Sequence, residues 1–126
     1  MPLNPSHIVQ IAIPVEDLAR ARRFYGEKLG LTHLFDAPPG LAFFQCGQTR
    51  LMLSRPETPD QAKASILYYG VADARAAGAA LAADGATLVE SARCIARVAD
   101  KDIWLAIAED GEGNLLGLMS EKEVAG

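Results

Sequence analysis

The sequence predicts an α+β fold of two βαβββ units that form curved mixed β-sheets within one domain. An internal repeat is the main observation, because residues 8–30 align with residues 64–85 and match Asp17 to Asp73. In both copies a strand-like run leads to an acidic residue, then to a helical pattern and then to a glycine. The chain has 126 residues, the usual size of a single domain with its own core.

The first unit is predicted over about residues 7–54. Residues 9–15 are rich in β-branched side chains, which favours a strand. Asp17 suits the N-cap of a helix, since its carboxylate can accept the free N–H groups of the first turn. Apolar residues then recur at helical spacing up to Gly30, which suits a left-handed C-cap. Three strands are predicted after this helix, at residues 32–36, 41–46 and 50–54.

The second unit is predicted over about residues 64–120, with the same order of elements. A strand precedes Asp73, which is the predicted N-cap, and the following helix ends at Gly85. Three strands are predicted after it, at residues 87–90 (with an extension to 98), 103–108 and 115–120. Residues 55–63, which contain two prolines, are predicted to link the units.

Composition excludes several classes of protein. Apolar residues make up 50% of the chain and the net charge is -4, without the basic stripe typical of nucleic-acid binding. No apolar run approaches the roughly 18 residues of a membrane span, and the first residues lack the pattern of a signal peptide. We therefore expect a cytoplasmic protein with neither nucleic-acid nor membrane partners. Cys46 and Cys94 lie far apart without a CxxC spacing, which is typical of reduced thiols.

Two stretches carry a family resemblance. The run IAIPVEDLARARRFYGEKLGL resembles the opening of the vicinal oxygen chelate superfamily, which includes glyoxalase I, fosfomycin- and bleomycin-resistance proteins and extradiol dioxygenases. The run AEDGEGNLLGLMSE resembles the closing strand of that superfamily. The resemblance covers about residues 7–120 and implies one glyoxalase/bleomycin resistance-like domain that pairs as a homodimer. It leaves the chemistry open, because one fold carries many functions.

The resemblance also assigns positions to a metal site. Four inward positions hold the ion in metal-using members, and here they fall on Gln10, Met52, Ile66 and Gly117. Catalytic divalent metals need carboxylate and imidazole ligands, which this set does not supply. We therefore expect no metal and no other cofactor. His7 and His33 are interpreted as surface or turn residues, because neither has a second ligand at a suitable spacing.

The groove between the two sheets is the predicted ligand site, because small-molecule sites are usually concave. Strand alternation sorts side chains to the groove or to the helices. It assigns Ile103, Leu105 and Ile107 to the helix side. The groove set is Gln10, Arg50, Met52, Ser54, Ile66, Tyr68, Trp104 and Met119. This mixture suits an organic ligand with a flat or apolar body, and Arg50 would bind an anionic or carbonyl end.

Purely structural roles are the alternative for three of these residues. Trp104 and Tyr68 could fill a closed core or a dimer contact, and Arg50 could be a solvated cation at a strand edge. Three functions remain. The first is metal-free binding of a small organic molecule, for sequestration, sensing or resistance. The second is a metal-independent isomerase or lyase that uses Arg50, Tyr68 or Gln10. The third, a metal-dependent lactoylglutathione lyase or dioxygenase, is disfavoured by the missing ligands.

Overall fold

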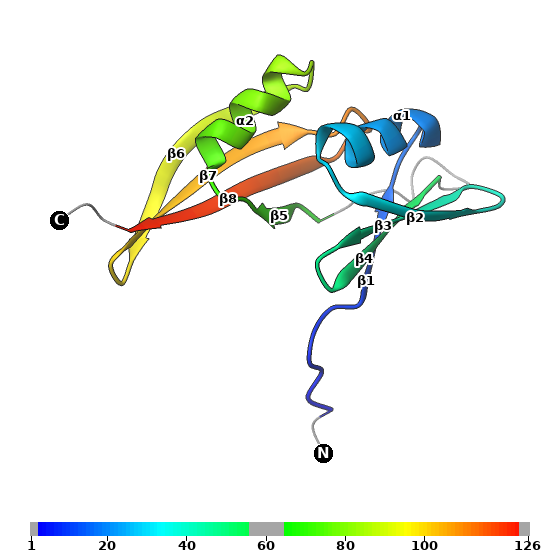
Figure 1. Cartoon of the computed structure of the whole chain (residues 1–126), viewed down its shortest axis with the longest axis horizontal. Helices are drawn as coiled ribbons and strands as arrows, with labels where there is room; N and C mark the ends of the chain where they lie inside the picture. The colour runs from blue at the N-terminus through cyan, green and yellow to red at the C-terminus, as the bar shows by residue number, and fades with distance from the viewer. Residues whose placement is uncertain (1–2, 56–64, 124–126) are drawn as a thin grey trace. The chain divides into compact units, whose positions relative to one another are not determined.

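A computed structural model describes residues 3–55 and 65–123 of the chain. It divides into two compact units, Met1–Ala64 and Ser65–Gly126, and we describe each unit by itself. Each unit has a four-stranded mixed sheet with helical structure on one face (Figure 1). The predicted α+β fold of two βαβββ units is therefore confirmed.

The first unit follows the predicted order of elements. These are β1 (Gln10–Pro14), α1 (Leu18–Arg23), η1 (Phe24–Lys28), β2 (Thr32–Ala37), β3 (Leu41–Cys46) and β4 (Thr49–Ser54). The strand order is β1-β4-β3-β2, in which β1 runs parallel to β4 and the other neighbours are antiparallel. The parallel pair is possible because the helix returns the chain across one face of the sheet.

The helical segment of the first unit begins and ends where the sequence predicts. The Asp17 carboxylate accepts a hydrogen bond from the backbone N–H of Arg20 at 3.0 Å, and Gly30 has a φ of +84°. The last part, η1, is a π-helix, which helical spacing alone did not predict. Phe24 and Tyr25 begin this π-helix and are buried, so the wider turn still places its apolar side chains in the core.

The second unit repeats the arrangement. Its elements are β5 (Leu67–Gly70), α2 (Ala74–Ala83), β6 (Leu88–Val98), β7 (Lys101–Glu109) and β8 (Leu115–Glu123). The order is β5-β8-β7-β6, with β5 parallel to β8. The Asp73 carboxylate accepts from the N–H groups of Arg75 and Ala76, and Gly85 ends the helix at a φ of +91°. Both predicted caps are confirmed.

Each unit has a core between its helix and its sheet. In the first unit this core is Ile13, Val15, Ala21, Phe24, Tyr25, Ala42, Phe44, Leu51 and Leu53, and Phe43 is buried on the other face of the sheet. In the second unit it is Tyr69, Ala74, Leu81, Ala106, Ala108, Leu116 and Leu118, and Ile107 is buried on the other face. The second core is poorer in large side chains, because α2 is mostly alanine and lies close to the sheet. A Cβ added to Gly78 of α2 would stand 3.4 Å from the Cβ of Ala106.

The sixth strand takes one of its two predicted forms, and the predicted linker lies almost wholly outside the described residues. The sixth strand extends to Val98, as the longer of its two predicted forms does, and its pairing with β7 is irregular at three places. Except for Arg55, the predicted linker lies outside the described residues. Among the residues that are described, no helix has the length and apolar character needed to cross a membrane.

Candidate functional site

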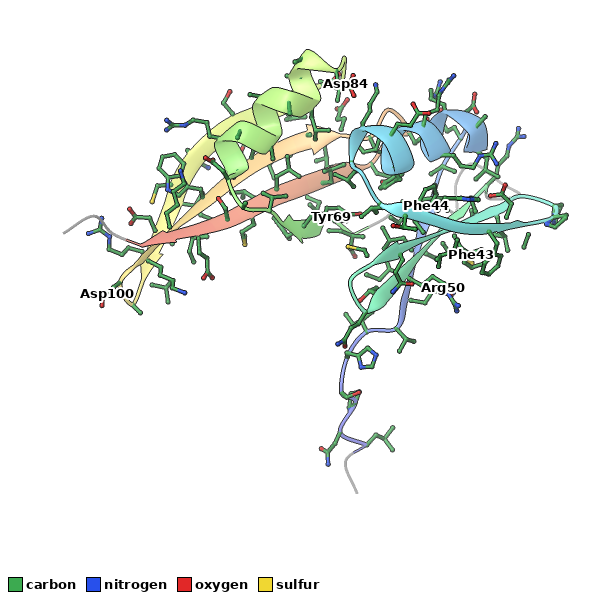
Figure 2. All side chains as sticks on the ribbon, viewed as in Figure 1. Phe43, Phe44, Arg50, Tyr69, Asp84 and Asp100 are labelled. Atoms are coloured by element: carbon green, nitrogen blue, oxygen red, sulfur yellow. The ribbon has the colours of Figure 1, made fainter. Side chains whose placement is uncertain are left out.

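The first sheet brings four predicted site residues to one face. Strand β1 pairs with β4 so that Gln10 is opposite Arg50, Ala12 is opposite Met52 and Pro14 is opposite Ser54. Leu51 and Leu53 alternate with this set and are buried. We call the side away from α1 the first open face; Gln10, Arg50, Met52 and Ser54 all lie on it. Figure 2 shows Arg50 and Phe43 on this side and Phe44 on the side of α1.

A row of contacts crosses the first open face from strand to strand. The side-chain oxygen Oε1 of Gln10 accepts a hydrogen bond from Nε of Arg50 at 2.8 Å. The Arg50 guanidinium carbon lies 5.5 Å from the centre of the Phe43 ring. Phe43 in turn stacks on Phe35, with ring centres 4.5 Å apart and planes inclined by 24°. We call these four residues the open-face row; they come from β1, β4, β3 and β2.

Neither phenylalanine of the open-face row was predicted from the sequence. Phe43 and Phe44 are adjacent, so their apolar character could not show which of them faces α1. The register decides it, since Phe43 is opposite Met52 and Phe44 is opposite Leu51. The side of the sheet on which Phe35 lies could not be predicted, because the pairing of β2 with β3 shifts between His33 and Phe35. The phenylalanine pair at 43–44 was the available signal that one aromatic ring leaves the core.

The open-face row carries one positive charge. Gln10 is neutral, and within residues 3–55 and 65–123 no Asp or Glu forms an ion pair with Arg50. The nitrogen Nε2 of Gln10 also approaches Sδ of Met52 at 3.8 Å, which fixes the amide between a cation and a thioether. Arg50 is exposed, and Phe35 keeps 47% of its surface exposed. The row therefore offers an accessible cation at Arg50 and an accessible aromatic ring at Phe35, joined by the buried ring of Phe43.

The second sheet also has a face away from its helix, here called the second open face. Tyr68 of β5 is opposite Gly117 of β8, and Met119 is opposite Leu105 of β7. Tyr68 and Met119 therefore lie on this face, as predicted. Ile66 precedes β5 and is 40% exposed. The predicted groove draws residues from both units, and it stays a prediction.

Trp104 is not where the sequence predicted it. It is opposite Ser120, whose Oγ accepts a hydrogen bond from the N–H of Ala74 at the start of α2. The Arg75 guanidinium carbon lies 5.0 Å from the centre of the Trp104 ring, and Nζ of Lys122 lies 6.0 Å from it. Trp104 therefore lies on the α2 side of the sheet and does not join Tyr68.

The same reversal applies to the whole of β7. Because Leu105 and Ile107 pair with Met119 and Gly117, these large residues lie on the second open face. The small residue Ala106 lies under α2 and is fully buried. The prediction assumed that the larger apolar side chains pack against the helix. It was wrong because α2 approaches through Gly78, and only a small side chain fits beneath it.

The residues at the four positions that the resemblance assigns to a metal do not fit a catalytic divalent ion. Gln10 accepts a hydrogen bond from a cation, Met52 offers a thioether and Ile66 a hydrocarbon. Gly117 has no side chain, and a Cβ there would stand 2.3 Å from Cδ1 of Tyr68. In the part of the chain that the structure describes, no three His, Cys, Asp or Glu side chains gather as a metal site would require.

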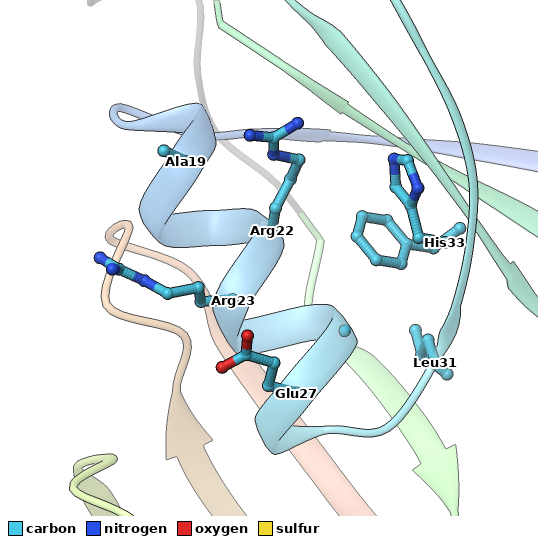
Figure 3. Close-up of a pocket in the computed structure, with 8 residues that line it drawn as sticks. Ala19, Arg22, Arg23, Glu27, Leu31 and His33 are labelled. Carbon is cyan, nitrogen blue, oxygen red and sulfur yellow. The ribbon is translucent and has the colours of Figure 1, made fainter.

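A separate cleft of about 510 Å³ lies beside the helical segment of the first unit (Figure 3). It is lined by Ala19, Arg22, Arg23, Gly26, Glu27, Leu31, His33 and Phe44. Asp36 accepts a hydrogen bond from Arg22, and Nε2 of His33 lies 2.8 Å from its Oδ1. The bond with His33, and then the charge of Arg22, lower the pKa of Asp36. Asp36 thus partly neutralises the cationic lining, so this cleft is the weaker candidate for an anion.

Comparisons with known proteins agree with the fold. A model of the Glyoxalase/Bleomycin resistance protein/Dioxygenase superfamily matches residues 7–118. A putative glyoxalase family protein from Bacillus anthracis is 20% identical, with a TM-score of 0.76 over 97% of this chain and 100% of that one. TnmS3, an antibiotic binding protein from Streptomyces sp. CB03234, is 23% identical, with a TM-score of 0.75 over 96% and 100%.

A lactoylglutathione lyase from Agrobacterium tumefaciens is also similar, with 19% identity and a TM-score of 0.71 over 93% of this chain and 95% of that one. No curated protein matches. At these identities the structures share the fold alone. Since the same fold serves a binding protein and a lyase, the function has to be argued from the site.

Proposed function

Because the chain belongs to the glyoxalase/bleomycin resistance protein/dioxygenase superfamily, we propose that it binds a small organic molecule without a metal ion and releases it unchanged. The binding would serve sequestration, sensing or resistance. The open-face row is the observation that carries this proposal. It combines a cation, a neutral amide and two stacked rings on an exposed sheet face.

The chemistry of both open faces supports binding more than catalysis. The proposed ligand contacts in the first unit are Gln10, Arg50, Met52 and Ser54, extended by Phe35 and Phe43. In the second unit they are Ile66, Tyr68 and Met119. Aromatic and thioether side chains bind flat organic molecules through large apolar contact areas, and a few polar groups orient them. The likeness to an antibiotic binding protein is compatible with such a ligand.

A metal-independent isomerase or lyase is the second candidate. It is favoured by the Gln10–Arg50 pair, since a guanidinium fixed by an amide can stabilise an oxyanion that develops on a substrate. A metal-dependent lactoylglutathione lyase or dioxygenase is disfavoured, because the residues at the positions that the resemblance assigns to a metal supply neither a carboxylate nor an imidazole.

One experiment distinguishes the binding function from the catalytic one. The full chain is titrated by calorimetry with a panel of fused-ring aromatic compounds, both neutral and acidic. Each compound that binds is then incubated with the protein overnight and analysed by mass spectrometry. Saturable binding at one site per chain with unchanged compound supports the binding function. A new product whose formation is lost in Arg50→Ala supports the enzyme, and no binding by any compound overturns the proposal.

We also propose that the chain forms a homodimer and lies in the cytoplasm. The homodimer is proposed from the resemblance to the family, and the location from the ordinary globular composition of the chain. Sedimentation equilibrium of the full chain tests the first of these, and a mass equal to one chain would overturn it.

A further inference from the structure

We infer that the ligand of the first open face is a fused-ring aromatic acid, whose anionic group binds Arg50 while its ring system lies along Phe43 and Phe35. This inference rests on the proposed binding function and adds the chemical class of the ligand. Three features of the open-face row support it, and they concern charge, aromatic surface and length.

The first feature is an unused edge of the Arg50 guanidinium. Its Nε donates to Oε1 of Gln10 at 2.8 Å, which fixes the plane of the group. The other two nitrogens, Nη1 and Nη2, make no hydrogen bond within residues 3–55 and 65–123. These two nitrogens can donate in parallel to both oxygens of a carboxylate, the geometry that makes arginine selective for planar anions. A neutral carbonyl would use only part of this edge.

The second feature is the exposed ring of Phe35. Its partner Phe43 is 8% exposed and supports it from one side at 4.5 Å, whereas Phe35 itself is 47% exposed. A large apolar ring left in water on an edge strand is unfavourable, and a flat apolar partner relieves that cost. Offset stacking on such a ring adds to the gain from buried area. The ring therefore favours an aromatic body over a sugar or an aliphatic chain.

The third feature is the length of the row. Arg50 lies on β4 and Phe35 on β2, with β3 between them. Two spacings between neighbouring strands amount to roughly 10 Å. A single benzoate ring is too short to reach Phe35 from Arg50, whereas a carboxylate on two or three fused rings spans the row. The side chains thus select for length as well as for charge.

The test compares two probes of the same size and ring system, anthracene-2-carboxylate, which is an anion with two acceptor oxygens, and anthracene-2-carboxamide, which is neutral and has one. Each is titrated into the full chain by calorimetry at low salt. We expect the acid to bind about tenfold more tightly than the amide, because only the acid is charged and meets both guanidinium nitrogens. Benzoate should bind at least about tenfold more weakly than the anthracene acid. Equal affinities of acid and amide would overturn the inference.

Variants then locate the effect. Arg50→Gln should remove the preference for the acid, because the acid loses a charged partner and the amide loses at most one hydrogen bond, and Arg50→Lys should keep part of that preference. Phe35→Leu should weaken both probes. Arg23→Gln, a change of the same kind on exposed α1, is the matched control and should alter neither probe. If Arg50→Gln and Arg23→Gln behave alike, the anion does not bind Arg50 and the inference is wrong.

The outcomes separate this inference from the proposed function. If neither probe binds and no member of the wider aromatic panel does, the proposed function fails. If the amide binds as well as the acid and Phe35→Leu weakens both, the function stands and the ligand class is wrong. If sedimentation shows that the acid separates an oligomer into single chains, the face is an interface with a second copy of the chain. That result would overturn the inference. The comparison of the two probes needs no variant and so does not depend on variants folding.

Discussion

The ring of Tyr68 covers Gly117 on the neighbouring strand so closely that a Cβ at position 117 would stand 2.3 Å from Cδ1 of Tyr68. The two residues are direct partners in the pairing of β5 with β8. A glycine in a strand leaves backbone open, and a cross-strand aromatic ring fills that space. The ring and a side chain at position 117 therefore exclude each other, and this is the position where the family resemblance would place a metal-binding carboxylate.

Gly117→Ala should destabilise the protein by about 1–3 kcal/mol, because the Tyr68 ring has to leave its place over the strand. Urea denaturation of the full chain measures the free energy of unfolding. In the double variant Gly117→Ala with Tyr68→Ala, the clash is absent, so the cost of the alanine should largely disappear. Gly70→Ala is the matched control in the same sheet, since an added Cβ there meets nothing within 4 Å. Equal effects of Gly117→Ala and Gly70→Ala would contradict the contact.

Gly78→Val should also destabilise the second unit. An added Cβ at Gly78 already lies 3.4 Å from the Cβ of Ala106 and from Cδ1 of Leu88, so the two further methyl groups of valine would force α2 away from β7. The expected cost is about 1–3 kcal/mol in the free energy of unfolding. Ala79→Val lies on the exposed side of the same helix and should lower the free energy of unfolding by less than about 1 kcal/mol, because valine only has a lower helix propensity than alanine. A variant Gly78→Val as stable as Ala79→Val would mean that α2 does not lie this close to the sheet.

Trp104→Phe tests the correction to the predicted site. Trp104 lies on the α2 side of its sheet with Arg75 and Lys122, so its replacement should change the affinity for anthracene-2-carboxylate by less than about twofold. The same calorimetric titration that finds the loss in Arg50→Gln provides the comparison. If Trp104→Phe lowers the affinity for the acid as much as Arg50→Gln does, Trp104 contacts the ligand and the correction is wrong.

Stability should fall in acid because three aspartates have lowered pKa values. The backbone N–H of Arg20 lowers the pKa of Asp17, His33 lowers that of Asp36, and the N–H of Ala76 lowers that of Asp73. A carboxylate whose pKa is lower in the folded state stabilises that state above the ordinary value of 3.8. This contribution disappears as the pH falls from 3.8 through the lowered values. The free energy of unfolding measured from pH 7 to acid should show this decline.

Asp73→Asn isolates one of these contributions. The asparagine keeps a side-chain oxygen for the cap, but it loses the charge that attracts Lys122, whose Nζ lies 3.3 Å from Oδ2 of Asp73. The variant should be less stable than the natural chain at pH 7, and the difference should shrink in acid. Lys122→Gln should reproduce part of this change, since Lys122 is the second cause of the lowered pKa. An unchanged difference at every pH would show that the charge of Asp73 does not contribute.

Most of the fold follows from interactions between residues that are close together in the sequence. The caps at Asp17 and Asp73 formed as predicted, because a carboxylate before a helical pattern satisfies N–H groups within three residues of itself. The two left-handed glycines, Gly30 and Gly85, follow from backbone sterics alone. Alternation placed Gln10, Arg50 and Met52 correctly, since along β1 and β4 these residues alternate with the strongly apolar isoleucines and leucines that face the helix.

The sequence alone therefore determined the two βαβββ units, their caps and the places of Gln10, Arg50, Met52 and Ser54 on the first open face. Only the tertiary structure decided which side of β7 meets the helix and which phenylalanine, Phe43 or Phe44, leaves the core. Both sides of β7 are apolar, so the choice depends on how closely α2 approaches and not on hydrophobicity. The open-face row was likewise invisible in the sequence, because its contacts join four strands through pairing register and a shift in β2. Alternation describes one strand at a time, whereas a site depends on the registers between strands.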